Sequence, residues 1–198
     1  MPVVYASSAA VYGANPDVPL REDSITQPIS AYGADKLGCE LHARVATLAH
    51  GVPTVGLRFF NVYGPGQSPD SPYSGAISIF AGRLANLQTI DIHGDGSQMR
   101  DFVYVGDVVR HLIAAMADPG DAPGVFNVCT GEGTTIKALA NLMADLSGAP
   151  ADLKLQPPRP GDIARSLGDP KRAAAHFGFQ AGTRLAEGLS PTLRALGA

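Results

Sequence analysis

Two side chains four residues apart, Tyr32 and Lys36, carry the strongest chemical signal in the sequence. On a helix, residues at this spacing lie one above the other on the same face. A free tyrosine has a pKa near ~10 and is a poor base at neutral pH, but a neighbouring ammonium group favours the phenolate and lowers that pKa. The pair therefore suits a general base. A bare Y-x-x-x-K pattern also fits a tyrosine packed on a solvated lysine, so its surroundings must decide.

The elements that would position this pair can be read from the flanking sequence. Residues 3–7 form a short apolar run typical of a buried parallel strand, which leads directly into Ser7 and Ser8. Ser30 is a good N-cap for a helix that runs to about His50 and ends before Gly51. We expect a core-facing stripe on this helix, made of Leu37, Leu41, Val45 and Leu48.

The rest of the chain alternates strand and helix patterns, which predicts an α/β fold. A second buried strand, 52–60, is followed by Asn61, and a further strand is expected over 125–129. Two extended segments, 89–93 and 99–105, flank a Gly-Asp-Gly turn and form either a small hairpin or a separate pair. Helices are expected over 76–87, over 108–117 with Asp107 as the cap, and from Thr134 or Thr135 to Ser147, with a proline-rich loop over 156–162.

The composition excludes several classes of partner. The 198 residues are 45% hydrophobic and 17% charged, with a net charge of −3 and no run of Lys or Arg, which argues against nucleic acid and anionic membranes. The two cysteines, Cys39 and Cys129, have no metal-ligand spacing, so we expect no metal site. With no signal peptide and no apolar stretch of membrane-spanning length, a cytoplasmic location is expected.

Five motifs in the sequence, considered together, indicate what the Tyr32–Lys36 pair does. They are S-S-A-A-V-Y-G (7–13), Y-G-A-D-K (32–36), R-F-F-N-V-Y-G-P (58–65), G-D-G-S-Q-M-R-D-F-V-Y-V (94–105) and R-P-G-D-I (159–163). In this order and spacing they resemble the extended short-chain dehydrogenases/reductases of the NAD-dependent epimerase/dehydratase family, most closely the UDP-hexose 4-epimerases. Each motif is weak to moderate alone, and the five in sequence are a strong signal.

The resemblance implies a partial Rossmann parallel sheet with a small α+β substrate-binding domain. Residues 1–64 and 107–131 would form the residual Rossmann portion, and residues 65–106 and 132–198 the nucleotide-sugar-binding portion. The family begins with a glycine-rich turn that receives the NAD pyrophosphate. Only six residues precede Ser7, so this N-terminal NAD-binding half is expected to be absent.

The resemblance also assigns catalytic and cofactor roles. Tyr32 falls on the family's general base, Lys36 on its partner, and Ser8 on the serine that bridges the sugar hydroxyl and the tyrosine. Tyr32, Lys36 and Ser7 are the expected NAD contacts, with Lys36 at the nicotinamide ribose. The implied reaction removes the proton of the sugar's 4-hydroxyl and passes hydride to NAD, then returns it to the other face of a 4-keto sugar. Ala9 and Ala10 stand where dehydrating relatives carry an Asp-Glu pair, which favours epimerisation.

The remaining assignments concern the substrate, expected to be a UDP-sugar. Asn61, Arg100 and Arg159 match residues that contact the diphosphate. Asp162 matches an acid near the uridine ribose, and Ser166 falls at a position that gates the C2 substituent of the sugar. The sequence leaves open UDP-Glc/UDP-Gal against UDP-GlcNAc/UDP-GalNAc interconversion. For Arg100 a salt bridge with Asp101 is the simpler alternative.

Three hypotheses follow. The chain is the C-terminal part of a UDP-hexose 4-epimerase that needs the N-terminal half for activity, or a non-catalytic UDP-sugar-binding or scaffold fragment, or a remnant that folds poorly. The resemblance further implies a homodimer formed through the helix that carries Tyr32.

Overall fold

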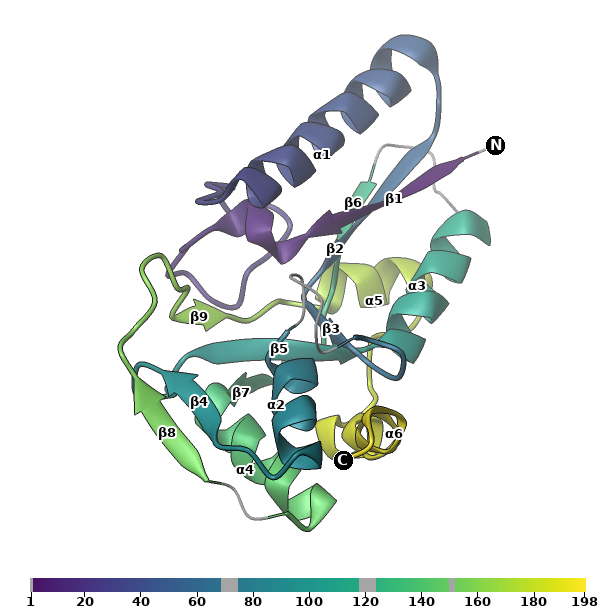
Figure 1. The fold of residues 1–198 in the computed structure, drawn as a ribbon. Helices are drawn as coiled ribbons and strands as arrows, with labels where there is room; N and C mark the ends of the chain where they lie inside the picture. The colour runs from purple at the N-terminus through teal and green to yellow at the C-terminus, as the bar shows by residue number, and fades with distance from the viewer. Residues whose placement is uncertain (1, 69–74, 118–123, 150–151) are drawn as a thin grey trace.

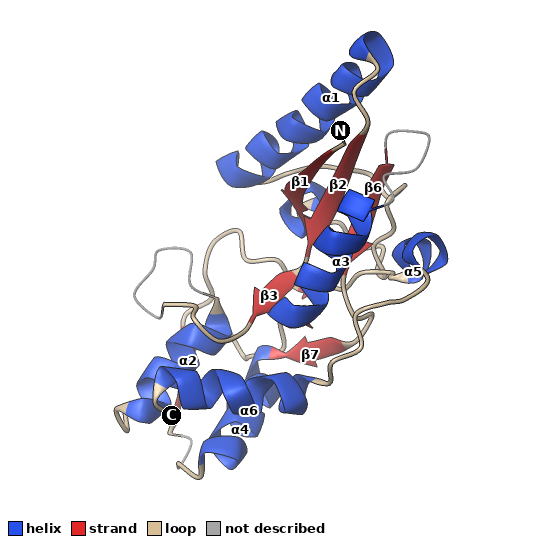
Figure 2. Ribbon diagram, turned by 90° about the vertical axis from the view of Figure 1, so that its right-hand side faces the viewer, coloured by secondary structure: helices blue, strands red, loops and turns tan. Residues whose placement is uncertain are grey.

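The centre of the fold is a three-stranded parallel sheet. The computed structural model describes residues 2–68, 75–117, 124–149 and 152–198. Strands β1 (Val3–Ser8), β2 (Thr54–Phe59) and β6 (Gly124–Val128) form the sheet seen edge-on in Figure 1, and they lie in the order β1-β2-β6 (Figure 2). Ser8 pairs with Phe59, and Phe59 with Val128, so the carboxyl ends of all three strands meet at one edge. This confirms the predicted α/β class with a parallel sheet.

Helices cover both faces of this sheet. Helix α1 (Ala31–His50) lies on one face, whereas α3 (Val105–Ala117) and α5 (Lys171–Phe177) lie on the other (Figures 1 and 2). The Oγ of Ser30 accepts the Gly33 N–H at 3.1 Å, and Gly51 ends the helix in the left-handed region with φ 65°. Both ends of α1 therefore form where the capping residues predicted them.

The predicted core stripe of α1 is wrong for three of its four residues. Leu41, Val45 and Leu48 are 58%, 56% and 67% exposed, and only Leu37 is half-buried. The helix instead turns Glu40 inward, where the carboxylate pairs with Arg58 of β2. Apolar spacing alone placed the buried face on the wrong side, because this face carries a charged residue, Glu40, in place of a continuous apolar stripe.

The second sheet lies beyond the carboxyl ends of the first. Strand β5 (Met99–Tyr104) is its centre, flanked by β3 (Asn61–Tyr63), antiparallel β7 (Gly133–Thr135) and parallel β9 (Arg165–Ser166). Strand β4 (Ile90–His93) pairs separately with β8 (Leu153–Gln156). The segments around Gly94-Asp95-Gly96 are therefore two extended segments with different partners and not a hairpin.

Three helices pack around the hydrophobic core next to the second sheet. They are α2 (Ala76–Ala85), α4 (Ile136–Ser147) and α6 (Leu185–Leu196), and the buried side chains between them include Phe80, Met143 and Leu189. Thr135 caps α4, as predicted. Asp107, however, lies inside α3 and not at its cap, and its carboxylate accepts the N–H groups of Gly182 and Thr183 at 3.2 and 2.9 Å. Within the described ranges, no helix has the length and apolar character needed to cross a bilayer.

Candidate functional site

Tyr32 and Lys36 are adjacent on α1, as their spacing predicts. Tyr32 lies in the first turn and is 49% exposed. The Nζ of Lys36 is 5.7 Å from the centroid of the Tyr32 ring and donates to the carbonyl oxygen of Ala6 at 3.1 Å. The ammonium group therefore lies between the tyrosine ring and the end of β1, which places a positive charge beside the phenol.

Ser8 lies on the segment against which the first turn of α1 packs. The chain leaves β1 as a short 3-10 helix, η1 (Ala9–Tyr12), and the Oγ of Ser8 caps it by accepting the Ala10 N–H at 3.2 Å. A Cβ on residue 33 would come within 2.6 Å of the Ala10 carbonyl oxygen, so only glycine permits this approach. Tyr32 and Ser8 thus belong to elements in direct contact, and their roles as base and bridge stay predictions.

Ser7 faces the interior. It is 2% exposed, and its hydroxyl donates to the Glu40 carboxylate. Its assignment as a cofactor contact stays a prediction, and its observed hydrogen bond ties β1 to α1.

A separate cavity of about 210 Å³ collects the residues expected to bind the diphosphate and the ribose. Its lining includes Asn61, Arg100, Arg159 and Asp162, which come from three motifs far apart in the sequence. Ser166 pairs with Arg100 across the β5–β9 ladder, so it lies beside this group. The other lining residues are Ala76, Ile79, Phe80, Asp91, Ile92, His93, Gln98, Phe102 and Ile136.

Arg100 is held in a fixed orientation at this cavity. One of its terminal nitrogens donates to the carbonyl oxygens of Met99 and Ile163 at 2.9 and 2.6 Å, and the other pairs with Asp162 at 2.6 Å. The expected alternative partner, Asp101, points elsewhere. Its buried carboxylate accepts three backbone N–H groups from two other segments, those of Thr130 and Gly131 and that of Gly168, and burial raises its pKa although those hydrogen bonds oppose the shift.

The sequence reasoning missed Gln98. Its Nε2 donates to the His93 carbonyl oxygen at 2.6 Å and to Oδ2 of Asp162 at 3.2 Å. Asp162 is therefore held on one oxygen by Arg100 and on the other by Gln98. A signal was present, because Gln98 is two residues before Arg100 in an extended segment, and alternate residues of a strand point to the same side.

This arrangement can recognise a phosphorylated ligand. Guanidinium groups form two parallel hydrogen bonds with phosphate oxygens, and two of them line the same cavity here. Carboxylates at the rim can accept hydrogen bonds from sugar hydroxyls. The cavity and the Tyr32–Lys36 pair thus offer anion binding and a potential base at two places in one fold.

Comparison with known proteins assigns the fold to a family. Residues 1–129 match the model of the NAD dependent epimerase/dehydratase family. The chain is 37% identical over 192 residues to a UDP-glucose 4-epimerase of Mycolicibacterium smegmatis, covering 96% of this chain and 61% of that protein.

Two solved structures are similar over almost the whole chain. One is a UDP-N-acetylglucosamine 4-epimerase from Methanobrevibacter ruminantium in complex with UDP-N-acetylmuramic acid, with a TM-score of 0.93 and 36% identity, covering 98% of this chain and 62% of that one. The other is a UDP-glucose 4-epimerase of Thermus thermophilus in complex with NAD, with a TM-score of 0.89 and 34% identity, covering 98% and 63%. The chain therefore spans less than two thirds of the length of these relatives, and it belongs to the NAD-dependent epimerase/dehydratase family.

Proposed function

We propose that this chain binds a UDP-hexose and supplies the base for its NAD-dependent 4-epimerisation through a 4-keto intermediate, together with an N-terminal NAD-binding half. The cavity carries the proposal, because it gathers Asn61, Arg100, Arg159 and Asp162, four residues assigned to the sugar nucleotide from three separate motifs. The cytoplasmic location expected from the sequence is part of the same proposal.

The proposed chemistry assigns one task to each side chain. Arg100 and Arg159 hold the diphosphate, and Asp162 accepts a ribose hydroxyl. Tyr32, beside the Lys36 ammonium, takes the proton of the 4-hydroxyl, while the Ser8 hydroxyl bridges the two oxygens. Bound NAD supplies the hydride acceptor for this step and the donor for its reversal.

The residues of this chain fit the nicotinamide end of NAD. Lys36 places hydrogen-bond donors at the carboxyl end of β1, and ligands of open α/β sheets bind at this end. The pyrophosphate site would come from the N-terminal half. Strand β1 is an edge of its sheet within the described residues, and Val3 on it is 49% exposed. This edge is where a further parallel strand of that half would pair.

The identity of the hexose is proposed from Ser166. This small side chain lies beside Arg100, and it leaves room for an N-acetyl group at C2, so both UDP-GlcNAc/UDP-GalNAc and UDP-Glc/UDP-Gal fit the proposal. We expect Ser166→Tyr to weaken binding of UDP-GlcNAc more than binding of UDP-Glc, measured by calorimetry. Equal weakening of both sugars would exclude Ser166 as the gate.

A homodimer through α1 is part of the proposal. The exposed stripe of Leu41, Val45 and Leu48 is apolar and follows one side of the helix. Replacing Leu41 and Val45 by Gln should lower the sedimentation-equilibrium mass towards that of a monomer. A monomeric parent chain, or a variant with unchanged mass, would contradict this interface.

The second candidate function is a non-catalytic UDP-sugar-binding module. It is favoured by one observation, that the residues proposed to contact UDP line one cavity of this chain while β1 lacks a neighbour on one side within the described residues. Calorimetric titration with UDP tests what both candidates share, and turnover of a UDP-hexose after addition of NAD and the NAD-binding half of a relative distinguishes them. UDP binding with turnover supports the enzyme, UDP binding without turnover supports the module, and no UDP binding overturns both.

A further inference from the structure

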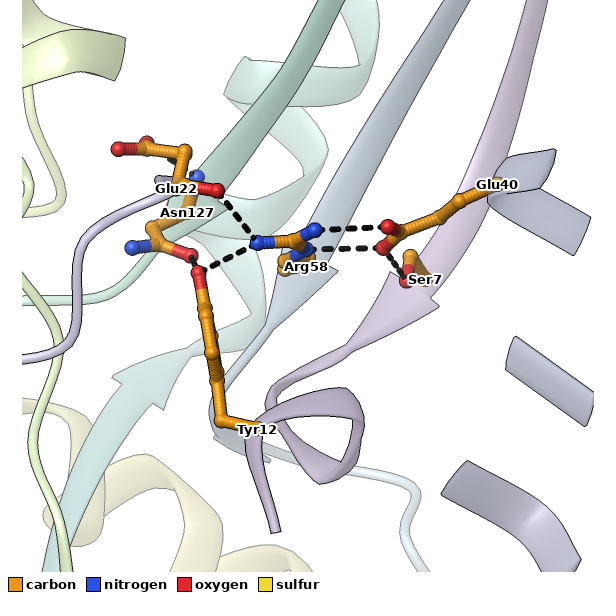
Figure 3. Close-up of polar contacts among 6 residues, drawn as sticks. All are labelled: Ser7, Tyr12, Glu22, Glu40, Arg58 and Asn127. Carbon is orange, nitrogen blue, oxygen red and sulfur yellow. Dashed lines mark hydrogen bonds and ion pairs between the residues drawn. The ribbon is translucent and has the colours of Figure 1, made fainter. Parts of the chain in front are cut away.

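A buried ion pair lies directly behind the strand end that carries Ser8. The side chains of Arg58 and Glu40 are 6% and 7% exposed. The Nε of Arg58 donates to one Glu40 oxygen at 2.8 Å and a terminal nitrogen pairs with the other at 2.7 Å (Figure 3). Burial by itself lowers the pKa of Arg58, but Glu40 and Tyr12 raise this pKa by more than burial lowers it. The guanidinium therefore stays charged. A buried ion pair is weak evidence for stability, because desolvation offsets its attraction.

The ion pair fixes the segment around Ser8 on both sides. Before Ser8, the hydroxyl of Ser7 donates to Glu40. After it, Arg58 donates to the Tyr12 hydroxyl at 2.8 Å, and this hydroxyl donates to Oδ1 of Asn127 on β6 at 2.7 Å (Figure 3). The exit of β1 is thus held at residues 7 and 12 by one connected network, with Ser8 between them.

The same ion pair fixes the rotation of α1. Tyr32, Lys36 and Glu40 follow one another at four-residue spacing and therefore lie along one face of the helix. Lys36 donates to the carbonyl oxygen of Ala6, and Glu40 accepts from the next residue of β1, Ser7. A rotation of α1 about its axis would break both contacts together.

We propose that Glu40 and Arg58 are positioning residues that set the placement of Lys36 and Tyr32 relative to Ser8. The description of these three groups as catalytic rests on the proposed function, whereas the geometric effect does not. An alternative reading, in which the pair only fills the core, predicts that a well-packed apolar replacement changes nothing at Lys36.

The test compares the chain with two variants. In Glu40→Leu/Arg58→Met both charges are replaced by apolar groups of similar size, which buried pairs often tolerate. In Glu40→Gln the shape is kept and the charge is lost, so this variant serves where the double variant fails to fold. The rate of lysine acetylation by acetic anhydride is measured by mass spectrometry for Lys36, with Lys171, whose side chain is 88% exposed, as the internal reference.

We expect Lys36 to react about fivefold faster relative to Lys171 in the variants, the change that follows from loss of one ordinary hydrogen bond. UDP affinity should change less than about twofold, which is below the effect of one lost hydrogen bond, because Arg100 lies on the second sheet and Asp162 on the loop that Arg100 holds, and neither touches the Glu40–Arg58 pair. An unchanged Lys36 ratio in either folded variant would overturn the proposal.

Turnover provides a separate readout. In a preparation supplied with the NAD-binding half of a relative, kcat should fall about 10- to 100-fold, as misplacement of reacting groups by about 1 Å predicts, with KM unchanged. A parallel rise in KM would contradict a positioning role. If the parent chain shows no turnover of substrate in this supplemented preparation, the proposed function fails. The acetylation ratio of Lys36 to Lys171 still decides the positioning proposal in that case.

Discussion

Arg100 and Asp162 form an ion pair of 2.6 Å at the rim of the cavity, although they come from a strand and from a proline-rich loop far apart in the chain. Both side chains are largely shielded, with 16% and 28% of their surfaces exposed. The pair fastens the loop between β8 and β9 to β5, so the second arginine of the cavity, Arg159, is carried on a loop that is already fixed. The cavity is thereby formed before any ligand arrives.

Gln98 should support ligand affinity indirectly. Replacing it with Leu removes the donor that holds Oδ2 of Asp162, and UDP affinity should fall about 2- to 10-fold, the effect of one ordinary hydrogen bond. Calorimetry provides the measurement, with Gln180→Leu as the control because Gln180 is exposed and does not line the cavity. Equal affinities for Gln98→Leu and the parent chain would show that Gln98 is dispensable.

The two interior glycines of α1 should respond in opposite ways to alanine. Gly38→Ala should stabilise the chain by about 0.5–1 kcal/mol, because a Cβ there meets no atom within 4 Å and alanine favours the helix. Gly33→Ala should destabilise it, because the new Cβ would lie 2.6 Å from the Ala10 carbonyl oxygen. Urea unfolding of both variants measures the contrast. Stabilisation by Gly33→Ala would mean that α1 does not pack on η1 as described.

Removing one partner of the buried ion pair should cost far more stability than removing both. Glu40→Ala leaves Arg58 buried without its carboxylate, and we expect the free energy of unfolding to fall by about 3–5 kcal/mol. The double variant Glu40→Leu/Arg58→Met should lose much less. Urea unfolding compares the two, and equal losses would argue that Arg58 is solvated in solution.

His111 should make stability depend on pH. The residue is 1% exposed, its Nδ1 lies 2.8 Å from the Asp107 carbonyl oxygen, and burial lowers its pKa below the usual 6.5. As pH falls through 6.5, the unfolded chain takes up the proton first, so the stability present above that pH is progressively lost. His111→Gln should show a smaller loss in unfolding free energy between about pH 7.5 and about pH 5.5, which bracket the ordinary histidine pKa. The same loss in both proteins would assign the pH dependence to other groups.

The sequence predicted local features well and long-range partners poorly. The caps at Ser30 and Thr135 were correct, because hydrogen bonds within a few residues decide them. The pairing of β4 with β8 was missed, because an extended pattern does not specify its neighbour across a long stretch of chain. The buried face of α1 was wrong for a related reason. The buried face of α1 carries Glu40, whose partner Arg58 is a charged residue on another element, and apolar periodicity does not reveal this pairing.

The candidate site was predictable to different degrees. The residues that line the cavity were predicted from a motif resemblance, and the fact that they meet in one cavity supports that resemblance. Gln98 could have been predicted from the sequence, because alternate residues of a strand point to the same side and Gln98 is two residues before Arg100. Asp91 and His93, in contrast, line the cavity from the separate strand β4. No local pattern connects that strand to the loop that carries Arg159.

The most direct test of the account is calorimetric titration of UDP into the parent chain and into Arg100→Gln/Arg159→Gln. The account predicts saturable one-to-one binding by the parent chain. It predicts at least about a 100-fold weaker affinity for the double variant, because each lost charged hydrogen bond contributes about 1.5–3 kcal/mol. Circular dichroism of both proteins should be the same. A parent chain that does not bind UDP, or a folded double variant that binds it equally well, would contradict the account.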